Sequence, residues 1–321
     1  MVKRALMLAL AALWLAAGVH AQEFPPKKAV TMYVGFSPGG AADSSARLIA
    51  KKLSENIGQT VIVENKPGAG GNIAHQITAQ GPTDGSVILF GSIGPLTIAP
   101  HMMKTGYDPF KDLAPISGGV QFASILVVNN QSGIKTLADY VAAAKKSAGA
   151  VTFASTGPGS ASHLTGELFA SRAGVEMTHV PYRGGSAAMP DLIAGRFTSY
   201  FAAPPTALPQ IEAGKITAIA VTGLQRMKEL PNVPTVAESG YPGFEALNWY
   251  AFVASSKTPA AILDRYNTEI VKVLNDPEVK AQLVKHGVTP MPTTRTEFAE
   301  FMRKESDQWG KIVRDKKITG E

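Results

Sequence analysis

The sequence predicts an α/β protein built from two similar lobes, and three observations support this prediction. Short β-like runs alternate with helical patterns along most of the chain, as they do in layered α/β folds. The 321 residues suffice for about two domains of ~150 residues each. One unit, a strand followed by a loop rich in Gly, Pro and Ser and then a helix, occurs twice, with its loops at 36–40 and 155–160. We expect each unit to belong to one lobe, with both helix starts facing a shared crevice.

The first half of the chain contains the strands and covering helix of one such sheet. Runs of β-forming residues predict strands at 30–34, 61–63 and 87–90. Loops rich in Gly follow the second and third of these strands, at 65–71 and 91–95. The helix after the first strand is amphipathic, because apolar residues recur on one of its faces at helical spacing: Ala46, Ile49, Ala50, Leu53 and Ile57.

The second half repeats this alternation. Apolar or β-branched runs predict strands at 125–128, 151–154, 177–181, 216–222 and 249–254. A helix is expected to begin near Leu137, and Pro and Gly interrupt the chain between 231 and 243. The last segment is predicted to be helical, since its large apolar residues lie at helical spacing: Phe298, Phe301, Met302, Trp309 and Ile312.

The N-terminus has the three parts of a secretory signal peptide. Lys3 and Arg4 precede an apolar run at 5–17, and small residues before Gln22 form a cleavage site ending at Ala21. The apolar run is shorter than the roughly 20 residues needed to span a membrane. The chain has no Cys to carry a lipid. We therefore expect an exported, unanchored protein.

Composition argues against several classes of function. The net charge of +6 is the difference between 31 Lys and Arg and 25 Asp and Glu, and the basic residues are scattered in pairs. Without a basic stripe, nucleic-acid binding is not expected. The absence of Cys also excludes disulfides, thiolate metal sites and Cys nucleophiles.

Catalytic motifs are incomplete in this sequence. The run at 184–188 places Ser186 as in a nucleophile elbow but lacks the closing Gly of GxSxG. The run at 68–73 follows a strand, yet Ile73 stands where a dinucleotide fingerprint has its third Gly. The histidines show no triad order. We therefore predict a protein that is not an enzyme and uses no cofactor.

The two repeated loops have the chemistry of an anion site. A helix start presents unpaired N–H groups and a partial positive charge, and Gly lets the backbone approach a ligand closely. Neither loop contains Lys or Arg, so a P-loop for nucleotide phosphates is not expected, and a singly charged carboxylate fits better. The alternative interpretation is a pair of ordinary strand-to-helix turns with capping Gly.

Single residues near the loops also have alternative interpretations. Asp43 either lies in the first turn of its helix or holds a bridging water, a ligand amine or a ligand hydroxyl. His163 and Glu167 share one helical face, but two ligands make a weak metal site, so we predict no metal and a hydrogen-bonding His163 near the cleft mouth. Tyr182 either lines a pocket or packs in a core.

Six distinctive motifs are spread along the chain. They are FSPGGAAD at 36–43, VENKPGAGG at 63–71, GPTDG at 81–85, HVPYRG at 179–184, LPNVPTVAE at 230–238 and GYPGFE at 240–245. Together they make the chain resemble one known family, the Bug-type periplasmic receptors of tripartite tricarboxylate transporters. The resemblance covers nearly the whole chain after the signal peptide. Ser37 stands where this family more often has Pro or Ala.

The resemblance implies a two-lobed periplasmic-binding-protein fold of type II-like form, with the ligand in the cleft between the lobes. After the signal peptide at 1–21, lobe 1 is expected from 22–123 plus 247–321 and lobe 2 from 124–246. The implied ligand-binding residues of lobe 1 are Phe36, Pro38, Gly39, Gly40, Ala41, Ala42, Asp43 and Ser92. Those of lobe 2 are Ser155, Thr156, Gly157, Gly159, Ser160, His163, Tyr182, Ala203 and Pro204.

The resemblance further implies a function. The protein would be a periplasmic monomer that captures a small mono- or dicarboxylate and delivers it to an inner-membrane permease of this transporter class. One alternative is a periplasmic receptor that senses such a ligand for a two-component system. A secreted hydrolase, which rests on Ser186 and the histidines, is a further alternative.

Overall fold

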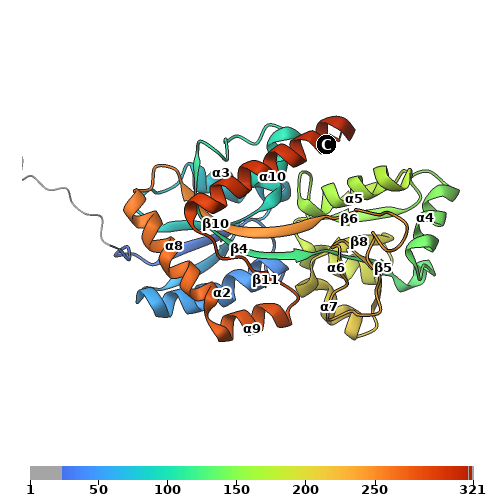
Figure 1. Cartoon of the computed structure of the whole chain (residues 1–321), viewed down its shortest axis with the longest axis horizontal. Coiled ribbons are helices and arrows are strands. Elements are labelled where there is room, and N and C mark those ends of the chain that lie inside the picture. The colour runs from blue at the N-terminus through green and yellow to red at the C-terminus, as the bar shows by residue number, and fades with distance from the viewer. Residues whose placement is uncertain (1–23, 317, 320–321) are drawn as a thin grey trace, which may run out of the picture.

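The computed structural model describes residues 24–316, 318 and 319, which form two α/β lobes lying side by side (Figure 1). One lobe is built on a six-stranded sheet and the other on a five-stranded sheet. The predicted α/β class with two lobes is confirmed. The signal peptide expected at 1–21 lies outside the described residues.

Lobe 1 contains the six-stranded sheet. Its strands are β1 (Val30–Val34), β2 (Val61–Asn65), β3 (Val87–Ser92), β4 (Leu113–Ala123), β10 (Leu247–Ser255) and β11 (Thr289–Pro290). Their order is β11-β4-β10-β3-β1-β2; β1 pairs in parallel with β2 and β3, and β10 is antiparallel to β3 and β4. The helices are α2 (Ala41–Ile57), α3 (Asn72–Ala79), α8 (Ala260–Asn275), α9 (Pro277–Lys285) and α10 (Arg295–Lys316), with short helical turns η1 (Ala69–Gly71), η2 (Gly94–Ile98) and η3 (Ala99–His101).

Lobe 2 contains the five-stranded sheet. Its strands are β5 (Ile125–Asn129), β6 (Thr152–Ser155), β7 (Thr178–Pro181), β8 (Ser199–Ala202) and β9 (Ile216–Val221). Their order is β7-β6-β8-β5-β9; β6 pairs in parallel with β7 and β8, and β5 is antiparallel to β8 and β9. The helical segments are η4 (Asn130–Ser132), α4 (Leu137–Lys146), α5 (Ala161–Ala173), α6 (Gly185–Ile193) and α7 (Pro204–Glu212). The repeated unit found in the sequence is thus β1-loop-α2 in lobe 1 and β6-loop-α5 in lobe 2.

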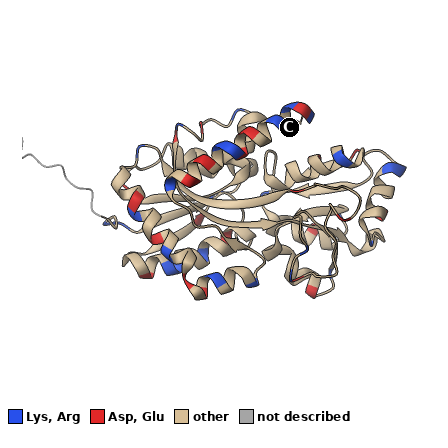
Figure 2. Ribbon diagram, in the orientation of Figure 1, with Lys and Arg blue, Asp and Glu red and all other residues tan. Residues whose placement is uncertain are grey.

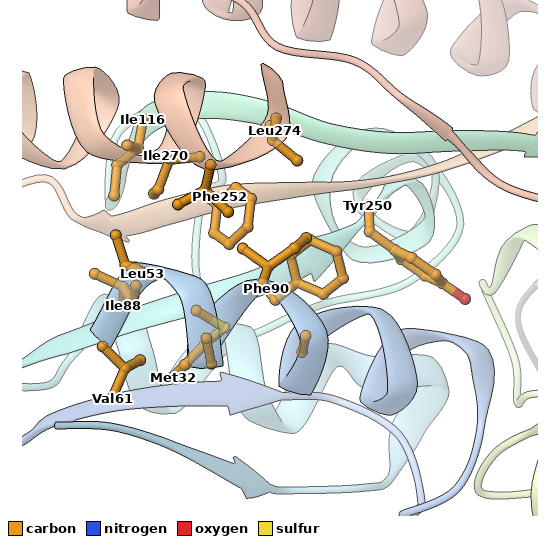
Figure 3. Close-up of a cluster of buried hydrophobic side chains, with 14 of the residues drawn as sticks. Met32, Leu53, Val61, Ile88, Phe90, Ile116, Tyr250, Phe252, Ile270 and Leu274 are labelled. Atoms are coloured by element: carbon orange, nitrogen blue, oxygen red, sulfur yellow. The ribbon is translucent and has the colours of Figure 1, made fainter. Parts of the chain in front are cut away.

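The apolar face predicted for the first helix forms part of the lobe 1 core. All five of its predicted residues are buried, and α2 ends where Gly58 adopts φ 65°, which interrupts the helical backbone. Figure 3 shows Leu53 of α2 beside Ile88 of β3, with Ile270 of α8 near Phe252 of β10. The core of lobe 1 therefore contains helices that precede lobe 2 in the sequence and helices that follow it. This requires the chain to return to lobe 1 after it has formed lobe 2.

Three strands were not predicted from the sequence: β4, β8 and the two-residue strand β11. β4 contains Pro115, Gly118 and Gly119, which disfavour a strand locally, but it pairs with β10 along its length and with β11 at one end. β8 has only four residues, all buried, so it gives little periodic signal. All three strands are stabilised by neighbours distant in sequence.

The chain passes between the lobes at two places. β4 ends at Ala123 and β5 begins at Ile125, and β9 ends at Val221 before β10 begins at Leu247. We propose to divide the lobes at 123/124 and 246/247. The C-terminal end of α10 also reaches lobe 2, where Lys316 lines a cavity with residues of α5 and β7.

Lys and Arg are interspersed with Asp and Glu along the helices in the ribbon view of Figure 2. This distribution agrees with the scattered basic pairs in the sequence. Among residues 24–316, 318 and 319, no helix combines the length and the apolar composition that a membrane span requires.

Candidate ligand-binding site between the lobes

The loop after β1 contacts lobe 2. The backbone N–H and the Oγ of Ser37 both donate to the carbonyl oxygen of Arg183, each at 3.1 Å, and Ser186 Oγ donates to Pro38 O at 2.8 Å. Arg183 and Ser186 follow β7, the strand that comes after the lobe 2 repeat unit. The first binding loop is therefore held against the opposite lobe through its own backbone.

The loop after β6 makes the reciprocal contact with lobe 1. It lies against Gly70, in the turn that follows β2, so closely that a Cβ atom on Gly70 would overlap the carbonyl oxygen of Pro158. Likewise, a Cβ on Gly94 would lie 2.6 Å from Gly159 O. Gly at these positions is thus required by close backbone approach between the lobes.

A small cavity of about 20 Å³ lies between these contacts at the carboxyl ends of the parallel strands. That volume holds about one water molecule. Both lobes contribute to its wall, which consists of Phe36, Ser92, Asn248 and Tyr250 from lobe 1 and Thr156, Ala161, Ser162, Tyr200, Phe201 and Ala203 from lobe 2. A crevice at this end of the sheets is the usual ligand position in open α/β folds.

Two polar atoms in the cavity wall lack a hydrogen-bond partner. They are Ser92 Oγ and Asn248 Oδ1, both buried. Buried polar atoms without partners cost about 1–3 kcal/mol each, so native proteins seldom leave them unsatisfied without a functional reason. The cavity therefore offers unused hydrogen-bonding capacity to a polar guest.

Two tyrosine hydroxyls add to this capacity. Burial raises the pKa of Tyr200, and burial together with the nearby Tyr200 raises the pKa of Tyr250. Both phenols thus remain protonated at neutral pH and can donate hydrogen bonds.

The lobe 2 side of the cavity is the N-terminus of α5. Ser160 is the N-cap, and its Oγ accepts from His163 N at 3.4 Å. Ser162 Oγ accepts the N–H of Thr156 at 3.0 Å and lies 3.3 Å from Thr156 Oγ1. The described residues lining the cavity include no Lys, Arg or His, so its donors are hydroxyl, amide and backbone groups at a helix start.

Asp43 stabilises the lobe 1 loop from within α2. Its carboxylate accepts from Gly39 N at 2.9 Å, from Asn65 Nδ2 at 2.9 Å and from Arg47 Nε at 3.0 Å. Burial raises the pKa of Asp43, but the hydrogen bonds from Arg47, Gly39 and Asn65 outweigh it, so the net pKa is lowered and the group is ionised at neutral pH. All of these interactions are within lobe 1, as expected if Asp43 lies in the first turn of its helix and stabilises the loop.

The structure brings some of the predicted binding residues together at the cavity and places others around it. Phe36, Ser92, Thr156 and Ala203 line the cavity. The remaining residues of both loops form the turns and helix starts behind it: Pro38, Gly39, Gly40, Ala41, Ala42, Asp43, Ser155, Gly157, Gly159 and Ser160. Pro204 opens α7 next to Ala203.

Tyr182 and His163 lie outside the cavity wall. The Tyr182 hydroxyl donates to Asp191 Oδ2 at 2.8 Å, and its ring packs on Phe197, so it lines a separate groove beside Gly157. His163 is 4% exposed and therefore does not lie at the cleft mouth as predicted. Its Nε2 is 3.8 Å from Glu167 Oε1, and no group of three metal-ligating side chains occurs among the described residues.

Sequence reasoning missed six residues of the cavity wall. Ala161 and Ser162 directly follow the predicted loop residues 155–160 and lie in the first turn of α5. Tyr200 and Phe201 lie on the unpredicted strand β8. Asn248 and Tyr250 lie on β10, for which the sequence predicts a strand at 249–254 but no binding role. Only the pairing of β10 with β3 and β4 shows that its start reaches the cavity.

Comparison with known proteins identifies the family. The family model described as "Tripartite tricarboxylate transporter family receptor" matches residues 45–318. The chain belongs to this receptor family. It is 34% identical to the protein BugT of Bordetella pertussis over 94% of this chain and 93% of BugT, which confirms the predicted Bug-type resemblance.

Solved structures of the family share its fold. One is R. palustris Rpa4515 with adipate, with a TM-score of 0.88 and 31% identity over 92% of this chain and 99% of that chain. Another is MatC from Rhodopseudomonas palustris with bound malate, with a TM-score of 0.86 and 28% identity over 90% and 99%. These relatives confirm the two-lobed periplasmic-binding-protein fold. Members of the family are periplasmic solute receptors rather than enzymes, as predicted for this chain.

The nucleophile considered in the sequence has a structural role instead. Ser186 lies at the start of α6, and its Oγ donates to Pro38 O across the lobe boundary. The hydrolase alternative is wrong because the chain belongs to a family of solute receptors.

Proposed function

We propose that this protein captures a small organic mono- or dicarboxylate between its lobes and delivers it to an inner-membrane permease of a tripartite tricarboxylate transporter. Support comes from the family of the chain and from two relatives whose structures hold adipate and malate. The observation that carries the proposal is the unsatisfied buried hydroxyl of Ser92, which can donate, beside the unsatisfied amide of Asn248 in a cavity without cations.

Neutral donors suffice to bind such a ligand. A hydrogen bond to a charged acceptor contributes about 1.5–3 kcal/mol, and micromolar affinity corresponds to about 8 kcal/mol. The hydroxyls of Ser92, Tyr200 and Tyr250 supply donors, and the amide of Asn248 can present either its N–H₂ or its oxygen. The N-terminus of α5 adds backbone donors on the lobe 2 side.

The lobes must separate to admit the ligand. A cavity of about 20 Å³ is far too small for a dicarboxylate of four or more carbons. The contacts of Ser37 and Ser186 with the opposite lobe must therefore break or lengthen during entry. We propose that these contacts form again around the acid and hold the liganded receptor closed.

The remaining parts of the proposal concern the form and location of the protein. We propose a monomer that is exported with a signal peptide cleaved near Ala21 and then acts freely in the periplasm. Mass spectrometry of the N-terminus of the exported protein tests the cleavage site, and sedimentation tests the monomer.

Calorimetric titration tests the proposed function itself. Protein stripped of ligand by unfolding and refolding is titrated with aliphatic and aromatic acids of four to eight carbons, including adipate and malate. Binding of at least one acid tighter than millimolar is expected. Failure of every acid in the panel would contradict carboxylate capture.

Replacing Ser92 with Ala should separate binding from stability. Loss of one ligand hydrogen bond is expected to weaken acid binding about tenfold, whereas removal of an unsatisfied buried hydroxyl should leave the free energy of unfolding unchanged or raise it by about 1 kcal/mol. Titration calorimetry and urea unfolding measure the two effects.

The matched control is Ser86→Ala. Ser86 Oγ donates to Asp84 Oδ1 in an exposed loop before β3, so this change should leave acid binding unaltered. A Ser92→Ala protein that binds as tightly as wild type would exclude this hydroxyl from the site.

A further inference from the structure

Two histidines pack directly behind the lobe 2 binding loop. His163 of α5 and His179 of β7 stack with ring centroids 4.0 Å apart, and His179 also stacks on Phe153 of β6 at 5.2 Å. A cavity of about 320 Å³ is lined by both rings together with Lys316 at the end of α10. The pair therefore lies between the binding loop and the C-terminal end of α10.

His179 forms a hydrogen bond with Ser155, at the start of the 155–160 loop. Its Nε2 lies 2.5 Å from Ser155 Oγ, and that oxygen accepts the N–H of Gly157 at 3.0 Å. Among the described residues, Nε2 of His179 is the acceptor available to the Ser155 hydroxyl hydrogen. His179 is thus expected to carry its own proton on Nδ1.

His163 is bonded to the end of the same loop through its other nitrogen. Its Nδ1 accepts the N–H of Gly159 at 3.3 Å, so its proton resides on Nε2. Gly157 and Gly159 have φ values of 117° and 72°. Because Gly has wide backbone freedom, these residues do not fix the conformation of the loop by themselves. External acceptors are one way to fix such a loop.

We propose that His163 and His179 are positioning residues, which hold the 155–160 loop in its binding form by accepting hydrogen bonds through opposite ring nitrogens. The inference rests on the proposed function, because that loop supplies Thr156 and the start of α5 to the ligand cavity. Neither ring needs to touch the ligand.

This arrangement requires both rings to be neutral. A proton on Nδ1 of His163 would point at the N–H of Gly159 and break that hydrogen bond, and two charged rings 4.0 Å apart would repel. Burial lowers the pKa of His179 to about 4; burial, with the charge of His179, lowers that of His163 to about 3. Among the described residues, the charged or titratable neighbours facing the pair are Glu167 of α5 and Lys316 of α10.

The sign of the pH dependence follows from these directions. Because the folded pKa values are below the ordinary 6.5, the unfolded chain binds protons that the folded loop rejects. The contribution to stability is therefore complete above about pH 6.5 and is lost as the pH falls toward 4. Ligand affinity depends on the folded loop, so we expect it to fall only as the pH approaches about 4, where the folded rings take up protons.

Paired substitutions test the proposal at pH 7.5 with adipate and malate as probes. His163→Asn keeps an acceptor near the Nδ1 position and should bind within about threefold of wild type. His163→Leu removes the acceptor and should bind at least tenfold more weakly. His286→Leu, at an exposed position after α9, is the control and should bind as wild type. Equal affinities for the Asn and Leu proteins would overturn the proposal.

A pH series distinguishes loop positioning from a packing role. The protonation of the acid ligand changes with pH in the same way for every variant. The ratio of wild-type to variant affinity at each pH therefore reports the effect of histidine protonation alone. The double variant His163→Asn, His179→Gln should lose less affinity between about pH 5.5 and 3.5 than wild type does, because this range includes the folded pKa of His179. Parallel curves would overturn the proposal.

Histidine ¹⁵N NMR provides a test that needs no ligand. The two rings should be opposite neutral tautomers at pH 7.5, with the proton of His163 on Nε2 and that of His179 on Nδ1. Any other pair of tautomers would overturn the proposal even if acids bind. If the tautomers are as expected but no acid binds, the proposed function fails while the hydrogen-bonded loop stands.

Discussion

Gly70→Ala should weaken carboxylate binding about 100-fold. Gly70 lies in the turn after β2, and a Cβ atom there would overlap the carbonyl oxygen of Pro158 in lobe 2. Forced overlap of this kind costs about 1–3 kcal/mol, and ~2.7 kcal/mol corresponds to a factor of 100 in affinity. Because the clash exists only when the lobes are together, the variant should fold but fail to close on its ligand.

The chain contains a matched control for this change. Gly58, at the end of α2, has φ 65°, close to the 63° of Gly70, so Ala at either position carries the same backbone strain. No atom lies within 4 Å of a Cβ on Gly58. Gly58→Ala should therefore lose stability without losing affinity, and only Gly70→Ala should lose both.

Titration calorimetry and small-angle scattering separate the possible outcomes. Wild type and Gly58→Ala should contract when an acid that binds is added, whereas Gly70→Ala should stay extended at the same ligand concentration. Equal affinities for the two Ala proteins would contradict lobe closure at the contact between Gly70 and Pro158.

Trp249→Ala should lower the free energy of unfolding by about 3–5 kcal/mol. Trp249 is 2% exposed on β10, and its ring contacts Phe298 and Phe301 of α10 edge-on at 5.7 and 5.5 Å. Its Nε1–H donates to Glu305 Oε2 at 3.1 Å. Truncation would leave a cavity and detach the last helix from the strand that begins in the ligand cavity.

Trp249→Phe provides the comparison for this truncation. It keeps an aromatic ring against α10 and loses only the outer part of the indole and one hydrogen bond, so a smaller loss of about 1–2 kcal/mol is expected. Urea unfolding followed by circular dichroism measures both variants. Equal losses would show that the indole N–H, rather than ring packing, joins α10 to β10.

The parts of the fold that could be predicted from sequence are those with strong local patterns. The helix with Ala46 and Ile49 on its buried face was found because its period of 3.6 residues needs no tertiary information. Most strands had enough β-branched residues to be recognised, and the Gly-rich loops marked the helix starts. β4 was missed because Pro115 and its Gly pair mask a strand that long-range pairing stabilises.

The candidate site divides in the same way. The loops could be read from sequence because backbone donors at helix starts depend on Gly, Pro and Ser in a short stretch. The cavity side chains could not, since Tyr200, Asn248 and Tyr250 come from strands separated by tens of residues and meet only when the sheets pack. Tyr182 was expected at the site because it lies within a matching motif, but its hydroxyl donates to Asp191 and does not line the cavity.

The two lobes, the repeated strand-loop-helix unit and the absence of cationic side chains from both loops could all be predicted without tertiary information. Each of these depends on composition and spacing along a short segment. Three features could be recognised only in the tertiary structure. They are the contacts between the loops of opposite lobes, the close approach of Gly70 to Pro158, and the stacking of His163 on His179 behind the 155–160 loop. Those contacts join residues from different strands and helices, and their geometry is fixed only when two sheets and the returning helix pack together.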